Sequence, residues 1–189
     1  MRYLFFIFIA FLTGCASYQA KDLASLDPYV VRNYPELDGL HIGCKAFTTQ
    51  DCLIYLGRNV MAKGYQPVQL TFKNTTEKSY VFSSKEISIP CTNPQEVAQS
   101  VYTSTLGRVV LYSPLIVPAI VDGVRSMNAN ARLNQDFHYK AQEHFIIPPG
   151  AYIKTLVFVP QAHYRPVFDL SLLERETGKH KTVGISLLK

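Results

Sequence analysis

Alternation of apolar and polar residues is the feature that most limits what this chain can fold into. From Leu40 to Phe47 and from Pro67 to Lys73, an apolar residue stands at every second position. That period of two is typical of a β-strand with one buried face. Similar runs bounded by turn residues fill the last third of the chain. We predict further strands at Tyr80–Phe82, Ile87–Ile89, Glu143–Ile147, Tyr152–Val159, Val167–Leu173 and Val183–Leu188.

Helix signals are confined to three places. Thr48 or Thr49 is a good N-cap for a helix over Gln50–Lys63, which Gly64 would end. The run Asn93-Pro94-Gln95-Glu96 combines an N-cap, Pro at N1 and Glu at N3, and predicts a second helix that ends at Gly107. A third helix is predicted from Ile116 onward. One face of it carries Ile116, Ile120, Gly123, Met127 and Ala131, and Arg132 is predicted to pair with Asp136 on a solvated face.

Short strands around one block of helices predict a mainly β fold. We expect one domain over residues 40–189, with a helical insertion at about 93–142. The expected architecture is an immunoglobulin-like antiparallel β-sandwich of about seven strands. An α+β domain, with a single sheet covered by the helices, is the alternative.

The N-terminal residues have the pattern of an export signal. Arg2 precedes the apolar run Tyr3–Leu12. Ten residues are too few to cross a bilayer, which needs about 20, but they suit the apolar region of a signal peptide. We therefore expect residues 1–14 to be removed and residues 15–39 to form a tether, either flexible or partly ordered.

Four motifs carry a resemblance to a known class of protein. The residues Leu12-Thr13-Gly14-Cys15 resemble the lipobox of bacterial lipoproteins. Together with Gly64–Val68, Ile89–Cys91 and Ile116–Gly123, they make the chain similar to an uncharacterised family of bacterial envelope lipoproteins. The resemblance implies a thioether-linked diacylglyceryl group and further acylation, such as palmitate, on Cys15. With Ala16 next to it, the resemblance implies an outer-membrane location facing the periplasm. A plain signal peptide with an incidental Cys is the alternative.

The other three cysteines are Cys44, Cys52 and Cys91. An exported protein meets an oxidising compartment, so one disulfide is expected. We predict the pair Cys52–Cys91, because both residues stand at the ends of predicted elements, with Cys44–Cys52 as second choice. No CxxC motif is present, and neither a redox motif nor a zinc site is indicated.

The sequence offers no recognisable catalytic constellation. The five histidines have no metal-binding spacing, the ten glycines form no phosphate-binding loop, and no serine lies in a GxSxG context. The net charge of +5 is scattered, which argues against a nucleic-acid partner. We predict no cofactor, no metal and no catalytic residue.

Two functional hypotheses remain. The first is a non-enzymatic interaction or scaffold module that is held on the lipid bilayer by acylated Cys15 and binds another envelope protein. The second is an envelope hydrolase whose site is assembled from distant residues. The apolar run Val109–Val121 is the candidate interaction surface of the first, and the alternatives for it are a buried core connection and shallow lipid contact. Its named positions are Val109, Leu111, Ile116 and Ile120.

Overall fold

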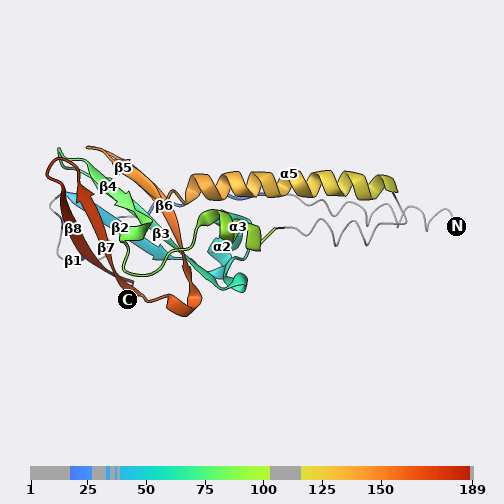
Figure 1. Cartoon of the computed structure of the whole chain (residues 1–189), viewed down its shortest axis with the longest axis horizontal. Coiled ribbons are helices and arrows are strands. Elements are labelled where there is room, and N and C mark those ends of the chain that lie inside the picture. Colours follow the sequence, from blue (N-terminus) through green and yellow to red (C-terminus); the bar gives the residue numbers. More distant parts are fainter. Residues whose placement is uncertain (1–17, 27–32, 35–36, 38, 103–115, 188–189) are drawn as a thin grey trace.

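The protein is mainly β, with its helices gathered at one end (Figure 1). The computed structural model describes residues 18–26, 33–34, 37, 39–102 and 116–187, with the backbone alone for 33–34 and 116–125. The sequence-based prediction of a mainly β chain with a helical insertion is confirmed. The insertion lies between strands β4 and β5 and holds α3 and α5.

The described strands form two antiparallel sheets. The small sheet has the order β2-β3-β6, with bounds Leu40–Ala46, Tyr65–Asn74 and Tyr152–Pro160. The large sheet has the order β1-β8-β7-β4-β5, with bounds Asn33–Tyr34, Lys179–Ser186, Val167–Glu174, Tyr80–Ser83 and His144–Ile147. Two sheets rule out the alternative of a single sheet covered by helices.

One face of each sheet contributes to a shared inter-sheet core. Ile42 on β2 and Leu70 and Phe72 on β3 are completely buried, as the alternation predicts. From the large sheet, Phe82 and Leu170 join the same cluster, and the Phe72 and Phe82 ring centroids are 5.3 Å apart. Each such side chain contributes about 1.5–3 kcal/mol by burial. The two sheets therefore pack face to face.

The other face of the small sheet is also buried, against the helices. Leu156 and Phe158 on β6 lie in this helix-side core with Leu56, Leu133 and Phe137. The rings of Phe137 and Phe158 stack with centroids 5.5 Å apart. The small sheet is thus the middle of three layers. One face of it meets the large sheet, and the other meets α2, α3 and α5.

Helix α2 spans Thr49–Leu56, shorter than predicted. Thr48 is its N-cap, and the side chains of Thr48 and Asp51 form a capping box. Gly57 ends the helix with φ of 60°, a conformation that glycine adopts without strain. The prediction of one helix to Lys63 was wrong, because this glycine breaks it. Residues Met61–Lys63 form a separate 3-10 turn, η1, before Gly64.

Helix α3 spans Pro94–Ser100 and starts at N-cap Asn93, as predicted. It ends at Ser100, earlier than predicted, and Gly107 lies outside the described residues. The strand predicted around Ile87 is reduced to a single bridge with Leu170. Two further 3-10 turns, η2 and η3, span Ser84–Glu86 and Gln161–His163.

Helix α5 spans Ile116–Lys140, so its predicted start is confirmed. Its N-terminal part projects beyond the sheets (Figure 1). On the face that was predicted to carry Met127 and Ala131, Met127 is 65% exposed and Ala131 is exposed as well. The buried side carries Ala129, Leu133 and Phe137 instead. Among the described residues, no helix is both long and apolar enough to cross a membrane.

Candidate functional site

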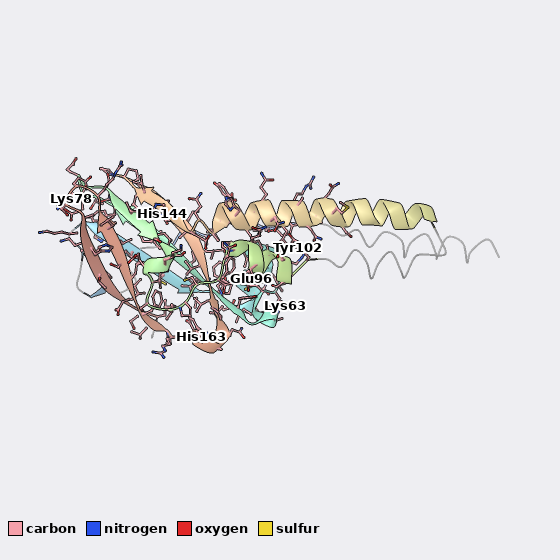
Figure 2. The ribbon with its side chains drawn as sticks, viewed as in Figure 1. Lys63, Lys78, Glu96, Tyr102, His144 and His163 are labelled. Atoms are coloured by element: carbon pink, nitrogen blue, oxygen red, sulfur yellow. The ribbon has the colours of Figure 1, made fainter. Side chains whose placement is uncertain are left out.

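A groove of about 880 Å³ lies between the start of α3 and the C-terminal turns of α5. Figure 2 labels His144 on β5, beside the base of α5, and Tyr102, just after α3 and below α5. The groove is lined by Asn93, Pro94, Gln95, Ala131, Asn134, Gln135, His138, Ala141, Gln142, Glu143 and His144. It is larger than a neighbouring hollow of about 500 Å³ on α5, with which it shares Gln135, His138 and Gln142.

Asn93 joins the two sides of this groove. Its Oδ1 accepts a hydrogen bond from the backbone N–H of Gln95 at 2.8 Å, which caps α3. Its Nδ2 donates to Oε2 of Glu143 at 3.1 Å. The backbone carbonyl of Glu143 also accepts from the N–H of Ser84 at 2.8 Å, so the segment after α5 is fixed from two directions.

One face of α5 forms the opposite wall. Ala131, Asn134, Gln135 and His138 follow each other at helical spacing, and all four line the groove. The Asn134 Nδ2 donates to the hydroxyl of Tyr102. Its Oδ1 is buried and has no hydrogen-bond partner among the described atoms.

The polar lining is dominated by carboxamides. A carboxamide both donates and accepts hydrogen bonds, as peptide groups and sugar hydroxyls do. The five in the groove are Asn93, Gln95, Asn134, Gln135 and Gln142. None of the described lining residues is Ser, Thr or Cys, and no group of His, Cys, Asp and Glu in the described part of the chain could hold a metal ion. The five carboxamides make the groove suited to contact with a polar ligand.

Cys91 lies just beyond the groove, at a small hollow that it shares with Glu143. Burial raises the pKa of its thiol to about 12, and the negative charge of Glu143 adds to the rise. The thiol donates a long hydrogen bond to the carbonyl of Ile89 at 3.6 Å. Since the thiolate is the reactive form, this cysteine is inert at neutral pH.

The predicted Cys52–Cys91 disulfide is not present. The structure holds Cys44, Cys52 and Cys91 as free thiols, so the second choice, Cys44–Cys52, is absent too. Cys52 belongs to the helix-side core, whereas Cys91 packs against the inter-sheet core. The position of both cysteines at the ends of elements was not enough to pair them, because their side chains pack in different cores.

Residues Tyr18–Leu26, which we name the strap, lie on the helix-side face of the small sheet. Lys154 Nζ donates to the carbonyl of Leu23 at 2.7 Å, and Gln69 Nε2 donates to that of Ala24 at 2.7 Å. The side chain of Leu23 is buried in the helix-side core. Within the tether expected over residues 15–39, this part is ordered and packed against the domain.

The strap begins at Tyr18, which contacts two helical regions. Its hydroxyl donates to Oδ2 of Asp136 on α5, and the Arg58 guanidinium lies 5.6 Å from its ring centroid. The same Asp136 oxygen pairs with Lys140 Nζ at 2.8 Å, and Lys140 also donates to the carbonyl of Tyr55. The predicted Arg132–Asp136 pair is thus replaced by Tyr18 and Lys140. Burial, and then the hydrogen bond to Asp136, raise the pKa of Tyr18.

The other predicted site residues lie where the structure describes no side chains. Cys15, Val109 and Leu111 are not among the described residues, and Ile116 and Ile120 are described by their backbone alone. Sequence patterns missed the groove because its walls come from two helices and a strand start. The one signal for it in the sequence was Asn93-Pro94. This pair predicted the start of α3, and both residues line the groove.

A scan against models of known protein families finds no match, and comparisons with curated proteins and with solved structures find none either. The role of the protein must therefore be inferred from its own residues.

Proposed function

We propose that the chain is a lipid-anchored envelope protein that holds a segment of another envelope protein in the groove between α3 and α5. Acylated Cys15 attaches it to the outer membrane, and the domain faces the periplasm. The observation that carries the proposal is the groove lined by five carboxamides. An extended peptide presents alternating N–H and C=O groups, which such side chains can pair.

The groove favours this role over that of an envelope hydrolase. Its described walls lack a hydroxyl or thiol nucleophile, and the adjacent Cys91 thiol is kept protonated by its high pKa. His138, Glu143 and His144 line the same groove and add polar groups that can contact a bound peptide. We assign these three residues a role in binding.

An immunoglobulin-like architecture is proposed for the sandwich that carries the groove. Counted from β2, the first, second and fifth strands form the small sheet, and the third, sixth and seventh lie in the large one. These are the sets that make the two sheets of an immunoglobulin-type sandwich. The fourth strand, β5, extends the large sheet beside β4, in the position of the additional strand in variable-type domains. The helical insertion then connects these two neighbouring strands.

Site-specific photo-crosslinking tests the groove as a binding site. A photoreactive amino acid is placed at Gln135 or Gln142 in the groove, and at exposed Thr182 on β8 as the control. In envelope membranes, the groove positions should give one discrete adduct whose mass spectrum contains peptides of another protein. The double change Asn134→Ala and His138→Ala should weaken that adduct several-fold. No adduct from folded, membrane-bound protein, or equal adducts from Thr182, would overturn the proposal.

The anchor is tested separately with Cys15→Ser. The change should abolish incorporation of labelled acyl chains and move the protein from the membrane to the soluble fraction. An Ala16→Ser variant serves as a control that leaves the thiol in place. Membrane partition and label that persist in Cys15→Ser would remove the lipoprotein part of the proposal.

A further inference from the structure

The strap runs from the small sheet to the helices. Its last residue, Leu26, accepts a hydrogen bond from the hydroxyl of Tyr152. Toward the N-terminus, the backbone N–H of Lys21 donates to the carbonyl of Ile54 on α2 at 2.9 Å. The strap then reaches Asp136 through Tyr18. The chain therefore travels from the sheet to the helices as it approaches its N-terminal end.

Only a short length of chain separates this contact from the proposed acylation site. Cys15 stands three residues before Tyr18. Three residues span about 10 Å when fully extended. Because Tyr18 is fastened to α5 and Arg58, acylated Cys15 would hold this end of the domain within about 10 Å of the lipid surface.

Helix α5 extends much farther than that. Ile116 precedes Asp136 by 20 positions along the helix, which corresponds to about 30 Å at 1.5 Å per residue. Figure 1 shows this part of α5 projecting beyond the sheets, away from the C-terminal strands. Because this length of helix is about three times the distance from Cys15 to Tyr18, the N-terminal end of α5 can meet the same bilayer when the helix lies at a low angle to the membrane surface.

The sequence at that end suits lipid. The first six residues of α5 are Ile116, Val117, Pro118, Ala119, Ile120 and Val121, and the first charge comes at Asp122. Six helical residues cover about 9 Å. Helices that lie at a membrane interface bury their apolar residues to a depth of about 5–10 Å. This short apolar segment suits shallow contact with the interface, and it ends at the charged residues Asp122 and Arg125.

We propose that the N-terminal end of α5, Ile116–Val121, inserts into the interfacial region of the same bilayer that holds acylated Cys15. The inference rests on the proposed acylation. Two attachments fix the orientation of the domain. The groove residues Ala131 to His138 then lie about 20–35 Å along α5 from the inserted end, beside the Tyr18–Asp136 contact.

Fluorescence quenching by lipids of known depth tests this inference. The acylated full chain carries an environment-sensitive fluorophore on Ile120→Cys and is placed in phosphatidylethanolamine–phosphatidylglycerol vesicles with doxyl-labelled lipid. Thr182→Cys on β8 is the control, and Met127→Cys, seven residues along α5, is the intermediate position. Wild-type protein measures any labelling of the native cysteines, which burial protects.

The label at position 120 should shift to the blue and be quenched several-fold more than the label at 182, with 127 in between. A glycine–serine linker inserted after Ser17 lengthens the segment between Cys15 and Tyr18 without removing Cys15. It should reduce quenching at position 120. Equal quenching at 120 and 182 overturns the inference. So does a blue shift that appears without vesicles as the protein concentration rises, because a second copy then covers this end of α5.

Mass spectrometry and vesicle flotation separate this failure from failure of the proposed function. A protein that carries acyl chains and floats with vesicles, yet shows no quenching at 120, refutes only the insertion of α5. A protein that carries no acyl chain refutes the anchor on which the inference rests. Quenching that is unchanged by the linker refutes the role of the strap in setting the depth.

Discussion

The hydroxyl of Tyr18 donates a hydrogen bond to the carboxylate of Asp136, 118 positions later in the chain. Lys140 pairs with the same carboxylate oxygen and reaches the carbonyl of Tyr55. Strap, α2 and α5 are therefore joined at one carboxylate. This link determines where the N-terminal end of the domain leaves the folded structure, and hence how the proposed anchor would orient the groove.

Alkaline pH should loosen the strap. The ordinary pKa of Tyr18 is 10.0, and burial together with Asp136 raises it in the folded protein. Stability from this group is therefore present below pH 10 and is lost as pH rises above it, by at most about 1.4 kcal/mol per pH unit. Solvent screening reduces this slope, because Tyr18 is only partly buried.

Urea unfolding between pH 7 and 11 measures the effect. The variant Tyr18→Phe should be less stable at neutral pH by about 1 kcal/mol, and its difference from wild type should shrink above pH 10. Tyr139→Phe, at a side chain that is 71% exposed, is the control. A difference that stays constant with pH would show that the Tyr18 hydroxyl does not titrate as argued.

Gly57→Ala should detach the strap. A Cβ at Gly57 would lie 2.5 Å from the carbonyl oxygen of Gln19, and φ is 60°. Gly178→Ala is a matched control, because φ is 67° there but no atom lies within 4 Å of the added carbon. Both variants bear left-handed strain of about 1 kcal/mol. Only Gly57→Ala should speed hydrogen exchange at the Lys21 amide, and equal exchange in both variants would contradict the close approach.

Phe137→Ala should destabilise the domain strongly. Phe137 is completely buried between α5 and the small sheet and stacks on Phe158. Loss of such a side chain costs about 3–5 kcal/mol in transfer and cavity terms. Tyr139→Ala, two residues away on the exposed side of α5, should change stability by less than about 0.5 kcal/mol. Similar melting temperatures for the two variants would show that α5 does not pack on the sheet as described.

The unfolded, acylated protein should contain three reactive thiols without any reductant. Cys44, Cys52 and Cys91 are free, and the Cys15 sulfur is occupied by the thioether of the proposed anchor. In the native state alkylation should be slow, because burial raises the pKa of Cys52 to about 11 and that of Cys91 to about 12. Mass spectrometry after alkylation in guanidinium counts the thiols. A single thiol would mean that a disulfide forms after all.

Glu174→Gln should change the acid sensitivity of the domain. Glu174 is buried on β7, and Lys78 Nζ lies 2.8 Å from its Oε1. The hydrogen bond from Lys78 lowers the pKa of this carboxyl from its ordinary 4.5. Stability from the pair is therefore complete above pH 4.5 and is lost as pH falls through the lowered pKa.

Thermal unfolding between pH 7 and 2.5 tests this prediction. Glu174→Gln should lower the melting temperature at pH 7 but make the difference from wild type vanish at the acid end. Glu77→Gln, at an exposed residue beside Lys78, is the control and should have little effect. A loss for Glu174→Gln that persists unchanged at pH 2.5 would contradict the role of the charged pair.

Local patterns in the sequence were sufficient for most of the elements. The alternation around Leu70 predicted β3 and its buried face, and Asn93-Pro94 predicted the start of α3. These signals succeed because a strand period or a cap involves residues within a few positions of one another. The same reasoning failed after Leu56. The helix was predicted to continue through Gly57, but the left-handed backbone of this glycine ends α2.

The faces of α5 show why the rest could not be foreseen. A helical period placed Met127 on one face with Ile116 and Ile120, but it did not show which face is covered: Met127 is exposed and Phe137 is buried. Several faces of this helix carry apolar residues, and the partner surfaces decide which of them is covered. Those surfaces belong to α3, α2 and β6, far away in the sequence.

The sequence by itself determined the mainly β class, the caps and turns that bound the elements, and the lipobox-like motif at Cys15. The tertiary structure alone decided that the small sheet is buried on both faces, that the strap docks against it, that Asp136 meets Tyr18 and Lys140, and that the cysteines stay apart. The physical reason is the range of the interactions. Propensities and caps act between neighbours in the chain, whereas burial and hydrogen bonds across layers join residues that only the folded chain brings together.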